Sequence, residues 1–287
     1  MNAAPGEKDA AALCADLVRS HDFTRYAATL LVSENQRRAL LALYAFNVEV
    51  SRVREMVTQP LTGEIRLQWW SDMLSGQGHG GIEGNPVAAE LLSVIKTFDL
   101  PVEMLSRLIE RHQFDLYNDP MPTLAALQEY ASDTSSALFA LSARIAAAPS
   151  AEIDELARHA GLAQGFVEVV AAIPRDASRR QLFLPSELLA KNGVSVDDMF
   201  AGRQTPSLRA TIDQLLGKAR QHLGTALSLL KDLSPEARAV FLPLAVVERD
   251  LARASRADND PFMPVARSHL STLWTLWRAS RSRKFRS

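Results

Sequence analysis

The sequence contains a single cysteine, Cys14, in 287 residues, so an intrachain disulfide bond cannot form. Cys14 follows Leu13 and precedes Leu17 in an alanine-rich segment, which predicts a small core residue and not a reactive thiol. One cysteine is typical of proteins in a reducing compartment. The composition, 47% hydrophobic and 23% charged, is that of a globular protein with a sizeable core.

The chain also lacks a charge surplus, a targeting signal and a long apolar run. Its formal net charge is -1, so no nucleic-acid partner is expected. Residues 1–12 carry charged side chains and no apolar run, which predicts neither a secretory signal nor a transit peptide. No stretch approaches the ~18 uninterrupted apolar residues of a membrane span. We expect a cytoplasmic protein or, alternatively, one attached peripherally to the inner membrane.

Common catalytic and metal-binding motifs are missing as well. The 6 histidines are scattered, and His-x-x-x-His, Cys-x-x-Cys and Gly-x-Ser-x-Gly do not occur. Each lone histidine is predicted to be a surface or packing residue.

Alternation of apolar and polar residues with period two is absent, and apolar residues recur every three or four positions instead, as in α-helices. The clearest run covers 35–57, where Ser33 and Gln36 form a capping-box pattern and Pro60 and Gly63 are expected to end the helix. Further helices are predicted over 65–74, 86–98, 101–117, 124–147, 152–173, 186–191, 207–232, 235–255 and 264–279. We therefore predict an all-α protein with an N-terminal segment and first helix over 1–20, one helical domain over 21–280 and a basic tail over 281–287.

Two helical stretches mix polar groups into apolar surroundings. The first runs from Tyr44 to Glu55. In the second, from Gly161 to Asp176, Glu168, Ala172 and Asp176 share one helix face. A carboxylate such as Glu168 is costly to bury unless it is paired or hydrated. The spacing alone favours a helix face that borders solvent, and it predicts that the two glycines, Gly161 and Gly165, allow close helix packing.

The same stretches carry a family resemblance. Tyr44-Ala45-Phe46 is similar to the start of the first signature of the squalene/phytoene synthase family, and the segment 161–185, ending in Leu182-Phe183-Leu184-Pro185, is similar to the second. Asp115-Leu116 and Tyr130 lie at matching separations between them. The resemblance implies an isoprenoid-synthase-like helical bundle with a central cup. In that family, two Asp-x-x-x-Asp motifs on facing helices hold Mg²⁺, which binds a prenyl diphosphate.

The sequence departs from that pattern at the metal motifs. The acids of the first motif fall on Ser51 and Glu55, with Arg52 between them, and those of the second fall on Ala172 and Asp176. The resemblance leaves Glu55, Glu168 and Asp176 as candidate ligands of one cation, and Mg²⁺ is expected only if synthase activity is retained. The predicted pocket residues are Tyr44, Asn47, Ser135, Ser136, Gln164 and Phe139, the last where the family usually has glycine.

Three further segments resemble one branch of the family, which contains mitochondrial complex I assembly factors and bacterial relatives. They are Asn47-Val48-Glu49, Arg66-Leu67-Gln68-Trp69-Trp70 and the segment 178–185. The resemblance implies a catalytically impaired protein that acts as a binding or membrane-complex assembly factor, with a respiratory-complex subunit or a prenyl lipid as partner. The alternatives are a head-to-head prenyl diphosphate synthase with an atypical metal site, and a prenyl-lipid binder without turnover.

The C-terminal region combines aromatic and basic residues. Trp274 and Trp277 precede a run of basic side chains, Arg278, Arg281, Arg283, Lys284 and Arg286. This combination predicts contact with an anionic membrane surface. The alternative is a docked last helix, with both tryptophans in the core and a tail that has no partner.

Overall fold

The computed structural model describes residues 5–77, 84–282 and 285, and these ranges contain helices and no strand, which confirms the predicted all-α fold. The first half comprises α1 (Pro5–His21), α2 (Phe23–Thr29), α3 (Glu34–Ser51), α4 (Val53–Met56), α5 (Pro60–Leu74), α6 (Pro86–Phe98), α7 (Val102–Arg111) and the 3-10 turn η1 (Phe114–Leu116). Next come α8 (Leu124–Ala131), the π-helical turn η2 (Ser132–Ser136) and α9 (Ala137–Ala146).

The second half begins with α10 (Ala151–Ser178) and continues with α11 (Ser186–Lys191), α12 (Val196–Phe200), α13 (Pro206–Leu229) and the 3-10 turn η3 (Leu230–Asp232). It ends with α14 (Pro235–Ala239), α15 (Leu244–Ala254) and α16 (His269–Ser280). None of the helices in the described ranges is long and apolar enough to cross a membrane.

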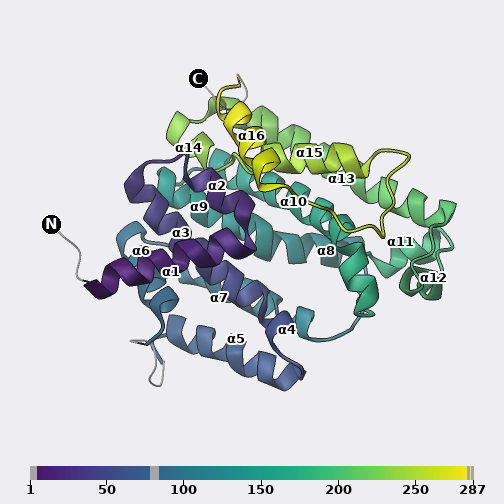
Figure 1. Ribbon diagram of the computed structural model, residues 1–287, viewed down its shortest axis with the longest axis horizontal. Coiled ribbons are helices and arrows are strands. Elements are labelled where there is room, and N and C mark those ends of the chain that lie inside the picture. Colours follow the sequence, from purple (N-terminus) through teal and green to yellow (C-terminus); the bar gives the residue numbers. More distant parts are fainter. Residues whose placement is uncertain (1–4, 78–83, 283–284, 286–287) are drawn as a thin grey trace.

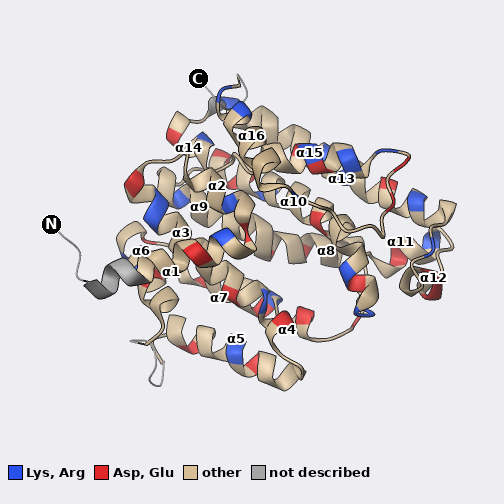
Figure 2. Ribbon diagram, viewed as in Figure 1, with Lys and Arg blue, Asp and Glu red and all other residues tan. Residues whose placement is uncertain are grey.

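Helix α10 runs through the centre of the bundle, with α13, α9, η2 and α15 packed around it (Figure 1). Helix α3 packs against α1, α6 and α9. Phe46, Phe166 and Phe241 are fully buried in the core between these layers. Acidic and basic residues are spread over many helices (Figure 2).

The two glycines of α10 permit close packing, as the sequence predicts. A Cβ atom at Gly161 would lie 2.1 Å from the backbone nitrogen of Ser136, and one at Gly165 would lie 2.8 Å from the Cβ of Ala131. Any larger residue at Gly161 would therefore push α10 away from η2.

Several predicted helix ends are wrong. The helix predicted over 35–57 breaks at Arg52, which separates α3 from α4. Pro60 is the first residue of α5 and Gly63 lies inside it, since proline suits the first helical turn as well as it stops a preceding helix. Pro174 lies inside α10 instead of ending it.

The capping box predicted at Ser33 is also wrong. The Ser33 hydroxyl donates to the side-chain oxygen of Gln36 and makes no bond to the helix backbone.

Candidate functional site

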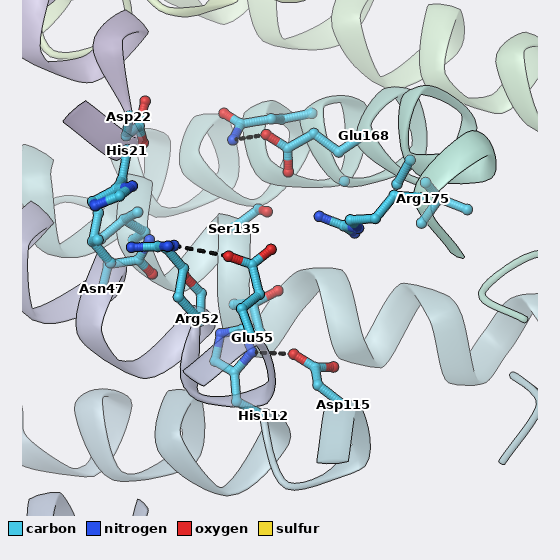
Figure 3. A pocket seen from close by; sticks show the side chains of 18 of the residues that line it. His21, Asp22, Asn47, Arg52, Glu55, His112, Asp115, Ser135, Glu168 and Arg175 are labelled. Carbon is cyan, nitrogen blue, oxygen red and sulfur yellow. Dashed lines mark hydrogen bonds and ion pairs between the residues drawn. The ribbon is translucent and has the colours of Figure 1, made fainter. Parts of the chain in front are cut away.

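A cavity of about 640 Å³ lies between the α3–α4 segment and the C-terminal half of α10. The start of α2, the α8–η2 segment, residues 112–115, residues 181–183 and residues 267–272 contribute to its wall. Arg52 and Glu55 face Glu168 and Arg175 across it (Figure 3). The two stretches that the sequence singled out therefore border one cavity.

The predicted site residues divide into two groups. The cavity wall contains Asn47, Ser51, Arg52, Glu55, Ser135, Gln164, Glu168, Ala172 and Asp176. Tyr44, Ser136 and Phe139 do not line it. Phe139 is buried and stacks on Phe241 with ring centroids 5.5 Å apart, and Ser136 donates its hydroxyl hydrogen bond to the backbone oxygen of Arg158.

Arg25 lies between the cavity and the buried rings of Tyr44 and Phe139. The sequence did not predict this residue as part of the site. Its guanidinium donates to the Asp22 carboxylate at 2.8 Å and to the Gln164 amide oxygen at 3.2 Å. It also lies 5.5 Å from the ring centre of Tyr44 and 5.7 Å from that of Phe139. Arg25 is only 7% exposed, so the cavity wall contains a buried cation.

The Arg25 contacts continue to the cavity surface. Gln164 donates from its amide nitrogen to a Glu168 carboxylate oxygen at 2.7 Å. The side chain of Glu168 is open to the cavity, but the protein around the cavity removes much of its water. This desolvation raises the pKa of Glu168, and the positive charge of Arg25 lowers it by a smaller amount. Asp22, Arg25, Gln164 and Glu168 thus form one hydrogen-bonded chain.

The two acids retained from the metal motifs both have arginine partners. Glu55 accepts from Arg52 at 2.9 Å, and an Arg179 nitrogen lies 3.7 Å away. Asp176 accepts from Arg175 at 3.0 Å, and its burial raises the pKa of the carboxyl while Arg175 lowers it. The neighbouring Arg54 also lines the cavity, and its Nε is buried without a hydrogen-bond partner in the part of the chain that the structure describes.

The donor set does not fit the Mg²⁺ ions that the resemblance implies. Within the described ranges, no group of three or more His, Cys, Asp and Glu side chains is placed to hold a metal ion. Hard divalent cations need several free oxygen ligands, and here the carboxylates of Glu55 and Asp176 are bonded to guanidinium groups. A metal-binding role for Glu55, Glu168 and Asp176 stays a prediction.

A second set of residues, outside the predicted site, also lines the cavity. His112 Nδ1 is 2.7 Å from the Asp115 carboxylate, and the Tyr130 hydroxyl donates to the same carboxylate at 2.8 Å. Burial and the charge of Asp115 raise the pKa of Tyr130 well above its ordinary value. Gln181 donates to the backbone oxygen of Asp115 at 3.0 Å, which fixes this set against the segment after α10.

Comparison with known proteins identifies the family that this fold and cavity resemble. The family model described as squalene/phytoene synthase matches residues 18–278. The rat protein named NADH dehydrogenase (ubiquinone) complex I, assembly factor 6, is 31% identical over 260 residues, which cover 91% of this chain and 78% of that protein. A presqualene diphosphate synthase from Rhodopseudomonas palustris is 29% identical over 202 residues, covering 70% and 72% of the two chains.

Solved structures show the same fold. A dehydrosqualene synthase superposes with a TM-score of 0.84 at 14% identity, covering 96% of each chain. A squalene synthase from Alicyclobacillus acidocaldarius superposes with a TM-score of 0.76 at 22% identity, covering 92% of this chain and 98% of the other.

Proposed function

The chain belongs to the squalene/phytoene synthase family, and we propose that it is a synthase-like assembly factor for a membrane-bound respiratory complex, without prenyl-coupling activity. The observation that carries this proposal is the pairing of both retained motif acids with arginines, Glu55 with Arg52 and Asp176 with Arg175. Prenyl coupling in this family needs metal ions to neutralise the departing diphosphate. Carboxylates already bonded to guanidinium groups are poor ligands for such ions.

The buried Arg25 supports the same proposal. A prenyl chain is purely apolar and needs an apolar channel to keep its reactive cation away from water. Here the inner wall presents the charged Asp22–Arg25 pair and the Gln164–Glu168 pair. Burying hydrocarbon against charged groups strips them of their water and is unfavourable.

The assembly role comes from similarity. The rat relative at 31% identity is named for complex I assembly, and the similarity extends over 91% of this chain. The proposed partner is accordingly a subunit of a respiratory complex. The proposed location is the cytoplasm, with peripheral attachment to the inner membrane, and the proposed working unit is the domain 21–280 followed by the tail 281–287.

A second candidate is a binder of a prenyl lipid without turnover. The cavity of about 640 Å³ and the arginines in its wall favour this role. Arg52, Arg54, Arg175 and Arg179 all line it and would attract a phosphate or diphosphate group. A synthase with an atypical metal site remains the third reading, and it requires the arginine pairs of Glu55 and Asp176 to open.

The proposal is tested by deleting the gene in its own organism. Native gels of the membrane fraction would measure the amount of assembled NADH dehydrogenase, and extraction would measure squalene and carotenoids. We expect loss of the assembled complex with unchanged prenyl products. Rescue should be complete with the wild-type chain and with the isosteric variant Asp176→Asn. Loss of prenyl products with a normal complex would overturn the assembly role.

A further inference from the structure

Helix α16 carries two apolar stripes, and only one of them faces the protein. Thr272, Leu276 and Ala279 are buried against the bundle, and the His269 ring stacks on Phe23 of α2 with centroids 3.8 Å apart. The opposite stripe consists of Leu270, Leu273, Trp274 and Trp277, which are all exposed. A helix on the surface of a globular protein needs one apolar stripe, so the second is available for contact with something else.

The exposed stripe of α16 continues onto the residues that follow α2. Leu30 and Leu31, just past the end of α2, are 43% and 39% exposed, and with the α16 stripe they line a groove of about 430 Å³. Leu270 and Trp274 are 79% and 61% exposed. We call the set Leu30, Leu31, Leu270, Leu273, Trp274 and Trp277 the α2–α16 face. Contiguous apolar surface of this kind marks a site of interaction with a protein or a membrane.

Basic groups lie beside this face. Residues 270–287 contain Arg278, Arg281, Arg283, Lys284 and Arg286 and no Asp or Glu. Within the described part, α16 carries one basic residue, Arg278, and no Asp or Glu, and Arg281 follows at its C-terminal end (Figure 2). The Arg281 guanidinium lies 4.2 Å from the ring centre of Trp277, and Arg37 donates to the backbone oxygens of Thr29 and Val32 beside the two leucines. Arg283, Lys284 and Arg286 lie outside the described residues.

The two tryptophans themselves have the chemistry of the headgroup region. They stack on each other with centroids 5.0 Å apart, and both are exposed. Tryptophan is enriched at membrane–water interfaces because its ring is apolar and its indole N–H can hydrogen bond to water or headgroups. The alternative in which both tryptophans pack in the core is wrong.

From the apolar stripe, its tryptophans and the basic groups around it, we propose that the α2–α16 face docks the protein onto an anionic lipid bilayer. The apolar side chains enter the level of the headgroups and upper acyl chains, and Arg37, Arg278 and Arg281 meet lipid phosphates. This inference rests on the proposed function in one respect, since an assembly factor for a membrane complex has to meet the membrane. The inference goes beyond the proposed function because it assigns the membrane contact to one face of the molecule.

The direct test is sedimentation of the full chain with vesicles of phosphatidylglycerol and phosphatidylcholine, compared with pure phosphatidylcholine. We expect binding to the anionic vesicles only, and release at high salt, because ions screen the arginine–phosphate attraction. The double variant Leu270→Glu and Trp274→Glu should lower the partition coefficient by about tenfold or more, since it removes apolar contact and adds repulsion.

A matched control is available on α5. Leu61 and Ile65 are 65% and 63% exposed and lie outside the α2–α16 face, so Leu61→Glu with Ile65→Glu makes a similar change at a different site. This control should bind vesicles like the wild type, and all variants should keep the wild-type unfolding midpoint. Equal loss of binding in both double variants would overturn the proposal.

Two further readouts keep the test independent of variant folding. Vesicles with brominated acyl chains should quench the tryptophan fluorescence of the wild-type protein, because Trp274 and Trp277 would sit within reach of the bromines. Light scattering should show a monomer at the same concentration. Absence of vesicle binding, or a dimer disrupted by Leu270→Glu, would instead assign this face to a protein partner or a second copy. Absence of vesicle binding by the wild-type chain, together with loss of the assembled complex on gene deletion, would defeat this inference and leave the proposed function standing.

Discussion

Arg25 decides the character of the cavity because it places a buried cation in the cavity wall. It pairs with Asp22, three residues earlier, and both side chains are largely shielded from solvent. The nearby pair Asp16–Arg19 has the same spacing but is exposed, at 66% and 56% of the side chain. The two pairs share residue types and spacing, and they differ in burial and in the additional contacts of Arg25 with Gln164 and two aromatic rings.

Replacing Arg25 with alanine should lower the free energy of unfolding by about 3 kcal/mol, because Asp22 would keep its burial and lose its partner. The Arg19→Ala control should lower it by less than about 0.5 kcal/mol, since exposed ion pairs contribute little. Urea unfolding at neutral pH measures both values. Equal effects of the two substitutions would show that Arg25 is not a structural part of the cavity wall.

His222 gives the protein a predictable response to acid. Its Nδ1 lies 2.8 Å from that of His159 on α10, with Arg158 and Lys218 nearby, and burial followed by these positive charges lowers the pKa of His222 to about 4. The unfolded chain binds this proton near pH 6.5 and the folded chain only near pH 4. Stability is therefore lost as the pH falls from 6.5 towards 4.

The expected loss is about 1 kcal/mol for this histidine, after allowance for its partial exposure to solvent. A His222→Gln variant should lose correspondingly less stability between pH 7 and pH 4.5. Urea midpoints of the two proteins at both pH values test this. If the urea midpoint of the variant shifts between the two pH values as much as that of the wild type, the lowered pKa of His222 does not account for the loss of stability in acid.

At the scale of elements, the contact between α10 and the π-helical turn η2 fixes the back of the cavity. Gly161→Ala should destabilise the protein by about 3 kcal/mol, since the new methyl group would meet the Ser136 backbone, which cannot rotate away. A methyl group at Gly224, inside α13, would meet no atom within 4 Å, so Gly224→Ala is the matched control. It should stabilise α13 by about 0.5–1 kcal/mol. Chemical unfolding of both variants distinguishes a packing effect from a helix-propensity effect, and a stable Gly161→Ala protein would refute the close contact.

Elements with clear end signals could be predicted from the sequence. The predicted bounds of α6, 86–98, and α11, 186–191, agree with the structure, because Pro86 starts the former and Asn192-Gly193 follows the latter. The break between α3 and α4 at Arg52 could not be predicted. The residue has backbone angles of φ -100° and ψ 3°, and no proline or glycine marks it.

From residue spacing alone, the candidate site was predictable only where it is local in sequence, and the family resemblance was needed to bring distant segments such as 44–55 and 161–176 together. Glu168 and Asp176 share a face because residues on α10 repeat every three or four positions, and that geometry follows from spacing. The partner of Gln164 is Arg25, 139 residues earlier, and only the tertiary fold brings them together. The π-helical turn that carries Ser135 to the cavity likewise has no sequence signature of its own.

At the scale of the whole molecule, a family fold encloses a cavity lined with paired charges. The bundle superposes on a dehydrosqualene synthase over 96% of each chain, so the arrangement of helices around the cup is the same. The cup of this chain carries arginines on the motif acids and a buried ion pair behind them. We propose that this chain has kept the fold that it shares with these synthases and has lost metal-dependent turnover.

The most direct measurement incubates the purified chain with farnesyl and geranylgeranyl diphosphate in the presence of Mg²⁺ or Mn²⁺ and identifies the products. We predict no head-to-head coupling product above the level of a buffer control, with either metal. A dehydrosqualene synthase assayed in parallel verifies the substrates and metals. Metal-dependent coupling by this chain that disappears in the Asp176→Ala variant would contradict the proposed loss of turnover.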